Sequence, residues 1–391
     1  VISADDLNHD LDIIYQWAYQ WKMEFNPDPS TQASEDLFSW KKVSPNHPQL
    51  IFNGTVVKKV NEQKHLGLIL DSGLCFKKHL DEKITKAKKY IGIIKHLSKF
   101  LPLKTLDQMY KALVRPHLDY CDIIYHIPPS INPPPQLPTF NTLMEKLERV
   151  QYQAALAVTG AWQGSNCSKL NEELGWETLS DRRMSRRILQ IHKIMNNKTP
   201  SYLKDKLPPN HRPFLSNVFR KINSKTDRYK NSFFPHAVSS WNIIISDFED
   251  FPSFNKLKVH LLSLFRPKSK SIFGIHDPMG LQYLFQLRVS LSPLRCHKFR
   301  HNFIDTPSDI CLCKQGVEDT SHFLFFCPFF AIQRATLINN VNEILLKNNL
   351  NHLGNQPELY LYGNDSINFV DNRKILISTL KYIKDSRRFS T

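Results

Sequence analysis

The chain has 391 residues, of which 41% are hydrophobic, so we expect two to four packed units rather than a disordered chain. Its 52 Lys and Arg against 36 Asp and Glu give a net charge of +16, which favours polyanionic partners, above all the phosphates of nucleic acid. No apolar run is long enough to span a membrane, and seven scattered cysteines argue against a secreted disulfide framework, so we expect an intracellular protein without a membrane partner.

The N-terminal part of the chain combines one amphipathic helix with short strands. Apolar residues recur at helical spacing over residues 5–25, and Asn26-Pro27 should end that helix. Asn53-Gly54 is a strong signal for a hairpin turn. We therefore expect the edge of a sheet, with strands over residues 35–41, 50–60 and 65–71.

Two adjacent carboxylates, Asp5 and Asp6, are a candidate for catalysis. A pair of this kind can hold two Mg²⁺ ions in a polymerase. In that motif the pair lies at the tip of a hairpin and a strand follows it, whereas the pattern from Leu7 onward predicts a helix. We interpret both residues as acids at a helix start, and an enzyme that uses them stays an alternative.

A lysine-rich helix is predicted over residues 77–99. Its apolar stripe consists of Leu80, Ile84, Ala87, Ile91 and Ile94, and eight lysines cover the remaining surface against Asp81 and Glu82. Such a surface is either a solvated face or a phosphate contact. The lysines that we select as nucleic-acid contacts are Lys83, Lys86, Lys88 and Lys89.

The rest of the chain is predicted to be mainly helical. A helix over residues 106–125 contains a kink at Arg115-Pro116, and six prolines between residues 127 and 140 predict a stiff linker. Short strands are our interpretation of residues 214–245, and residues 350–391 read as a polar and basic tail. Further helices are expected over residues 141–160, 180–197, 253–265, 278–290 and 328–349.

A Cys/His cluster follows the spacing Cys-x-Cys-x8-His-x4-Cys. Three thiols and one imidazole at short spacing are what a structural, tetrahedral zinc ion requires. The Cys-x-Cys start is tighter than the common Cys-x2-Cys, and a buried set of ordinary cysteines is the alternative. The predicted metal ligands are Cys311, Cys313, His322 and Cys327.

Basic and aromatic residues alternate just upstream of that cluster. Phe299 and Phe303 lie among cations, a composition that suits phosphate contact together with base stacking. A helix with a solvated basic face is the alternative. The predicted nucleic-acid contacts are Arg295, His297, Lys298 and Arg300.

Several stretches, taken in their order along the chain, carry a resemblance to a known family. They are residues 7–11 (Leu-Asn-His-Asp-Leu), 25–30 (Phe-Asn-Pro-Asp-Pro-Ser), 65–71 (His-Leu-Gly-Leu-Ile-Leu-Asp), 115–120 (Arg-Pro-His-Leu-Asp-Tyr), 174–183 (Leu-Gly-Trp-Glu-Thr-Leu-Ser-Asp-Arg-Arg), 231–235 (Asn-Ser-Phe-Phe-Pro) and the Cys/His cluster. Over about residues 5–345 the sequence resembles the non-LTR (LINE-type, jockey-like) retrotransposon reverse transcriptases.

The resemblance implies an α+β fold that is mostly α. It consists of a remnant of the reverse-transcriptase palm sheet, a helical thumb and a helical C-terminal region with a zinc knuckle. His65, Leu66 and Gly67 are implied to belong to the primer grip. The implied segments are a palm remnant (1–74), a thumb (75–126), a Pro-rich linker (127–140), a helical connector (141–210), a C-terminal region with a CCHC knuckle (211–349) and the tail (350–391).

The implied activity of the parent protein is RNA-directed DNA synthesis. Its Mg²⁺ would be held by carboxylates that precede Val1, so we expect a fragment that is inactive alone. Thr31 occupies a position where the family usually has Lys, which suggests a decayed or diverged copy.

The resemblance also implies the partners and the location. The expected partners are an RNA template, a DNA primer and target, and the missing palm and fingers of the parent polypeptide, with an endonuclease as an open addition. The expected location is a ribonucleoprotein in the nucleus and cytoplasm. The alternative is a free-standing zinc-knuckle module or domesticated relic without a polymerase role.

Overall fold

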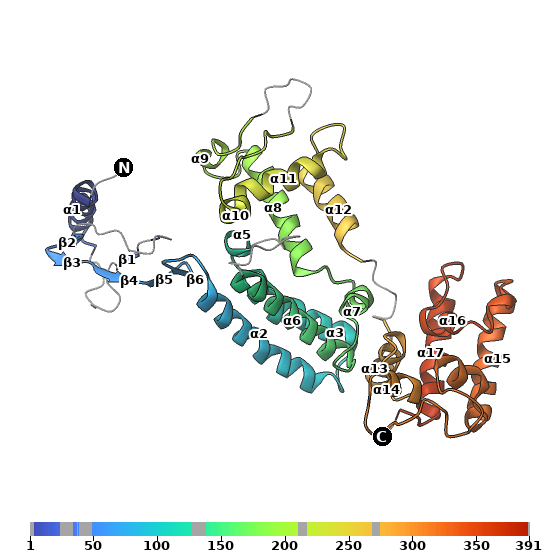
Figure 1. The fold of residues 1–391 in the computed structure, drawn as a ribbon. Coiled ribbons are helices and arrows are strands. Elements are labelled where there is room, and N and C mark those ends of the chain that lie inside the picture. The colour runs from blue at the N-terminus through green and yellow to red at the C-terminus, as the bar shows by residue number, and fades with distance from the viewer. Residues whose placement is uncertain are drawn as a thin grey trace. The chain divides into compact units, whose positions relative to one another are not determined.

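The computed structural model describes residues 4–23, 34–36, 38, 49–126, 138–209, 217–267 and 274–389 (Figure 1). Helices dominate the described residues and the strands are short, which agrees with an α+β fold that is mostly α. The chain divides into two compact units, Val1–Lys83 with Pro135–Leu143 and Ile84–Pro134 with Met144–Thr391. None of the described helices combines the length and the apolarity needed to cross a membrane.

The first unit begins with α1 (Ala4–Gln20), which has Asp5 and Asp6 in its first turn. Because the helix continues for four turns beyond them, no return strand follows this carboxylate pair, and the helix-start interpretation is confirmed. The expected stop at Asn26-Pro27 and the position of Thr31 lie outside the described residues.

Among the residues described after α1, the strands form three two-stranded sheets. β1 (Ser34–Asp36) pairs in parallel with β4 (Lys58–Val60), and β2 (Ile51–Phe52) pairs with β3 (Thr55–Val56) in the predicted hairpin. Asn53 and Gly54 have φ values of 50° and 69°, as a type I′ turn requires. The third sheet joins β5 (Glu62–His65) to β6 (Leu68–Asp71) in antiparallel register.

The segment predicted as one strand over residues 65–71 is therefore a turn followed by a strand. His65 pairs with Leu68, and Leu66 and Gly67 between them have φ values of 46° and 83°. A non-glycine residue at positive φ is uncommon, so Leu66 gave no signal for this turn. The three residues form the tip of a second hairpin.

The lysine-rich helix is α2 (Lys77–Leu97). Asp71 precedes it and accepts hydrogen bonds from the backbone N–H groups of Cys75 (2.8 Å) and Phe76 (2.6 Å). Its apolar stripe is buried as predicted, at Leu80, Ile84, Ala87, Ile91 and Ile94.

The helix predicted over residues 106–125 is broken into four pieces. They are α3 (Leu103–Met109), the π-helical turn η1 (Tyr110–Val114), α4 (Arg115–Asp119) and α5 (Asp122–Tyr125). Pro116 lacks an N–H group and its ring opposes the preceding turn, so the backbone widens into a π-helix before it. A left-handed Cys121, with φ 58°, then separates α4 from α5.

The stretch 174–183 forms part of the core between α6 (Pro138–Thr159), α7 (Cys167–Leu174) and α8 (Leu179–Met195). Trp176 stacks on Tyr110 with ring centroids 3.7 Å apart, and its Nε1 donates to Asp107 over 2.8 Å. Tyr110 in turn donates to the Gln151 side chain over 2.8 Å. Packing in this core therefore accounts for the stretch 174–183.

Residues 214–245 contain helices where short strands were expected. α9 (Ser201–Lys204) precedes this segment, which holds α10 (Asp227–Lys230) and α11 (Phe233–Ile245), and α12 (Phe254–Phe265) follows it. The β-branched run Ile243–Ile245 favours a strand by local preference, but Ala237, Trp241 and Ile244 place a helical face in one core with α8 and α12. Tertiary packing overrides the local preference here.

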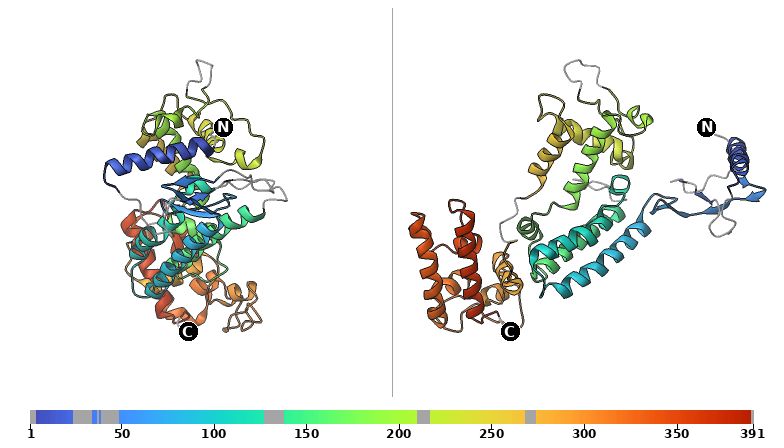
Figure 2. Two further views of the ribbon diagram at one scale, coloured as in Figure 1. Left: turned by 90° about the vertical axis from the view of Figure 1, so that its left-hand side faces the viewer. Right: turned by 180° about the vertical axis from the view of Figure 1, so that it is seen from behind.

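The C-terminal residues form a helical bundle. The prediction that residues 350–391 are a polar and basic tail is therefore wrong. Ile375, Leu380 and Ile383 have helical spacing and are buried, although exposed polar side chains hide this pattern in the composition. In Figure 2, α15 and α17 lie side by side. The elements are α13 (Pro278–Arg288), α14 (Arg295–Arg300), the π-helical η3 (His322–Phe326), η4 (Pro328–Phe330), α15 (Ala331–Lys347), η5 (Asn351–Leu353), α16 (Pro357–Tyr362) and α17 (Phe369–Asp385).

Buried histidines should make the fold sensitive to acid. Burial lowers the pKa of the buried His79 and His297, and of the partly buried His236, to about 4 each. In the unfolded chain these groups titrate near 6.5, so the unfolded state binds more protons and the free energy of unfolding falls as the pH drops from about 6.5 to 4. We expect a loss of about 3 kcal/mol at most for each histidine at the lower pH, measured by urea denaturation.

The matched control for this pH effect is an exposed histidine. His236→Gln should flatten the pH dependence of the urea midpoint, whereas His301→Gln at an exposed position should leave it unchanged. Equal slopes for both variants would contradict the assignment to buried histidines.

Candidate metal centre and basic surfaces

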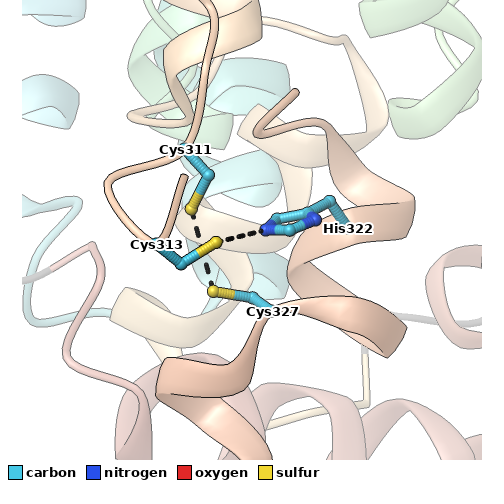
Figure 3. A group of neighbouring side chains, drawn as sticks. All are labelled: Cys311, Cys313, His322 and Cys327. Carbon is cyan, nitrogen blue, oxygen red and sulfur yellow. Dashed lines mark hydrogen bonds between the residues drawn. The ribbon is translucent and has the colours of Figure 1, made fainter. Parts of the chain in front are cut away.

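The four residues of the Cys/His cluster converge on one point (Figure 3), and their ligand atoms lie within 4.8 Å of one another. The sulfurs of Cys311 and Cys327 are 3.7 Å apart, and Cys313 Sγ lies 3.2 Å from His322 Nε2. A tetrahedral ion with metal–sulfur bonds of about 2.3 Å would separate two sulfurs by about 3.7 Å. All seven cysteines are free thiols, so this set can hold a metal ion.

A tight turn after the Cys-x-Cys segment helps to direct the thiols of Cys311 and Cys313 toward the other two residues of the cluster (Figure 3). Ile310 and Val317 form an isolated antiparallel bridge, and the Cys311 N–H donates to the Gly316 carbonyl over 2.8 Å. Lys314 and Gly316 lie between the two ends with φ values of 62° and 138°. The latter conformation favours glycine.

The π-helical turn η3 supplies the other two ligands. The His322 N–H donates to Asp319 Oδ1 over 2.7 Å, which fixes the start of the turn. The Cys327 N–H then donates to the His322 carbonyl over 2.8 Å. This bond spans five residues, as in a π-helix, and it brings Cys327 back beside His322.

The Cys/His cluster is supported by residues far along the chain, which the sequence did not reveal. The buried Glu318 carboxylate accepts hydrogen bonds from Arg388 Nε (2.7 Å) and Nη2 (2.8 Å) and from the Arg295 backbone N–H (2.8 Å). Arg334 Nη1 donates to the Cys327 carbonyl over 2.8 Å. Arg334 on α15 and Arg388, which follows α17, therefore hold the backbone of the ligand loops in place.

The thiols differ in acidity. Burial raises the pKa of the Cys311 thiol to about 12 and also raises that of Cys327. Burial acts in the same direction on Cys313, but hydrogen bonds that include the Gln315 N–H lower the pKa of this thiol overall. Because metals bind thiolates, an ion that binds here must displace these protons, and its affinity should rise with pH.

The basic segment upstream of the Cys/His cluster is only partly exposed. Arg300 is exposed, Lys298 is half-buried and ion-paired with Asp305, and Arg295 is half-buried. His297 is 4% exposed, and its Nδ1 lies 2.8 Å from Ser292 Oγ. The structure places His297 in the interior, so it cannot contact a ligand at the surface.

The remaining predicted contacts lie on α2 and on the second hairpin. Lys86, Lys88 and Lys89 are exposed, with Lys89 opposite the buried stripe and Lys86 and Lys88 on its two flanks, and Lys83 is half-buried. The hairpin tip carries an exposed His65 and a Leu66 with 82% of its surface exposed. The side chains predicted for nucleic-acid contact at these two places are therefore accessible.

Comparison with known proteins finds one informative similarity. Over 134 residues the chain is 27% identical to the RNA-directed DNA polymerase from the mobile element jockey of Drosophila funebris. The similarity relates this chain to mobile-element reverse transcriptases. The matched region covers 32% of this chain and 14% of the jockey polymerase, so the chain spans a small part of its relative. No protein-family model and no solved structure matches the chain.

Proposed function

We propose that this chain is the nucleic-acid-binding, C-terminal part of a mobile-element reverse transcriptase. In this role it grips the RNA template, the DNA primer and the target, while the Mg²⁺-binding carboxylates belong to the rest of the parent polypeptide. The observation that carries the proposal is the exposed lysine face of α2 in a chain similar to an RNA-directed DNA polymerase. The position of Asp5 and Asp6 in a helical turn supports a chain that is inactive alone.

The proposal assigns the contacts to three places that are exposed or partly exposed. They are the lysine face of α2, defined by Lys83, Lys86, Lys88 and Lys89, the hairpin tip at residues 65–67, and the segment with Arg295, Lys298 and Arg300. Lysines on a rigid helix can follow a phosphate backbone without reading the bases, which suits a polymerase that copies any sequence.

The proposal also assigns zinc to the Cys/His cluster. Three thiolates and one imidazole form a soft, closed ligand set that favours zinc over harder cations such as Mg²⁺. With four protein ligands no position stays open for a substrate. Zinc would hold the two loops of the knuckle together and would take no part in the polymerase reaction.

A charge-reversal experiment tests the lysine face of α2. The full chain should bind an RNA–DNA hybrid at low salt, and Lys86→Glu, Lys88→Glu and Lys89→Glu together should weaken binding roughly ten-fold or more. The slope of log K against log salt should fall by about 2 to 3, because each lost phosphate contact removes about 0.9 from it. Fluorescence anisotropy across a salt series measures both quantities.

Three exposed lysines elsewhere provide the matched control. Lys221→Glu, Lys225→Glu and Lys381→Glu change the net charge by the same amount outside the proposed contacts. Absence of binding at low salt, or equal losses in the two triple variants, would refute the proposed grip.

A further inference from the structure

Two hollows in the second unit follow one another along α12, and cations line both. The first has a volume of about 120 Å³ and is lined by Lys258 on α12 and by Arg182, Ser185 and Arg186 on α8. The second has a volume of about 510 Å³ and is lined by Arg266 at the end of α12 together with Lys104 and Lys111. Leu262 lines the first hollow, and Arg266 lies one helical turn, about 6 Å, beyond it.

We call these six cations the α12 basic track: Lys104, Lys111, Arg182, Arg186, Lys258 and Arg266. The carboxylates that line the same hollows are Asp107 and Glu177, and both form ion pairs with cations of the track. Asp107 pairs with Lys111 at 2.6 Å, and Glu177 pairs with Arg182 at 2.8 Å. The lining therefore keeps a surplus of positive charge.

Half of the α12 basic track has no carboxylate partner in the described part of the chain. Lys104, Lys258 and Arg266 form no ion pair there. Arg266 donates from Nε to the Gly175 carbonyl over 3.1 Å, which anchors the guanidinium. Its two terminal nitrogens make no hydrogen bond to any residue that the structure describes, and this leaves a fork of donors that matches phosphate oxygens.

We propose that the α12 basic track binds the phosphodiester backbone of a nucleic acid, at a place separate from the lysine face of α2. Lys258 and Arg266 are eight residues apart, which is about 12 Å along a helix. At an axial rise of about 3.4 Å per nucleotide, that length corresponds to three or four nucleotides. The smaller hollow has the space of about four waters, at about 30 Å³ each, and accommodates a phosphate group.

This inference rests on the proposed function, because it adds a second contact to the same nucleic acid. Nucleic acid is favoured over an anionic membrane because these cations line hollows, into which single phosphates along a strand can enter. A flat membrane surface would meet cations on a protruding face. Arg182 and Arg186 are held by Asp119, at 2.6 and 2.8 Å, so part of the track is ordered before any ligand arrives.

The test removes the three unpaired cations from the full chain. Lys104→Gln, Lys258→Gln and Arg266→Gln together should weaken binding of an RNA–DNA hybrid roughly ten-fold and lower the salt slope by about 2. The control with Lys221→Gln, Lys225→Gln and Lys381→Gln has the same net charge and should retain the wild-type slope within about 0.5. Lys104→Gln with Lys258→Gln, which leaves the Arg266 anchor intact, should give an intermediate loss with an unchanged melting temperature.

The outcomes separate this inference from the proposed function. If the wild-type chain binds and the α2 variant is weakened while the track variant matches its control, only the α12 basic track is refuted. If the wild-type chain does not bind at all, both are refuted. A track variant that loses binding to phosphatidylserine vesicles but keeps its affinity for nucleic acid would replace the proposed ligand with a membrane surface.

Discussion

The protein should contain about one zinc ion per chain, and removal of that ion should unfold the loops around residues 311–327. All four residues of the Cys/His cluster lie in the segment 311–327, whose regular structure consists of the five-residue π-helical turn η3 and an isolated bridge that ends at Val317. In small zinc domains the metal contributes on the order of 10 kcal/mol to folding. We expect a smaller loss here, about 3–5 kcal/mol, because the apolar contacts of Phe323 and Tyr382 persist without the ion.

A pair of cysteine variants tests this expectation. Cys311→Ser should reduce the zinc content to near zero and lower the melting temperature, as should a chelator added to the wild-type chain. Cys167→Ser alters an exposed cysteine outside the ligand set and should change neither quantity. The assignment fails if the purified chain is folded without metal and Cys311, Cys313 and Cys327 react with an alkylating agent as fast as Cys167.

Glu173→Ala should destabilise the second unit by about 3–5 kcal/mol. Arg288 and Glu173 form an ion pair whose side chains are 1% and 5% exposed. Arg288 also donates from Nε to the Leu361 carbonyl over 2.8 Å, and its guanidinium lies 4.8 Å from the centre of the Tyr362 ring. Removal of the carboxylate leaves a buried charge without its counterion, because the remaining partners are neutral.

Two further variants show whether the loss of stability comes from the buried Arg288 charge that has lost its counterion. Glu173→Leu combined with Arg288→Met removes both charges and should recover most of the stability, since an apolar pair of similar volume needs no counterion. Glu172→Ala changes the exposed neighbour and should cost at most about 0.5 kcal/mol in urea denaturation. If Glu173→Ala is as mild as Glu172→Ala, this pair does not stabilise the fold as described.

Features with a short sequence period or a distinctive residue set could be predicted from the sequence. The buried stripe of α2 follows from apolar residues at helical spacing, and the first hairpin follows from Asn53-Gly54. The four residues of the Cys/His cluster lie within 17 positions and are of types that share one chemistry. In each case the physical cause acts between near neighbours in the chain.

The supporting contacts could not be predicted, because their partners are distant in sequence. Glu318 and Arg388 are 70 residues apart, and Glu173 and Arg288 are 115 apart. Nothing in the spacing of either pair indicates a contact. The same reasoning explains His297, whose basic neighbours suggested a surface position, whereas the fold buries it against Ser292. Charge alone does not distinguish an exposed cation from one that stabilises the interior.

The bond between Glu318 and Arg388 has a consequence for the timing of biosynthesis. All four residues of the Cys/His cluster have been synthesised once Cys327 has been added, but Arg388 follows Glu318 by 70 residues. Cys327 and Arg388 are 61 positions apart, so at about 5–20 residues per second the translation between them takes roughly 3 to 12 s. If the Cys/His cluster binds a metal ion, as we propose, the nascent chain can therefore bind it before the guanidinium that pairs with Glu318 exists. A premature stop codon between positions 327 and 388 would yield chains that carry every ligand yet lack this partner.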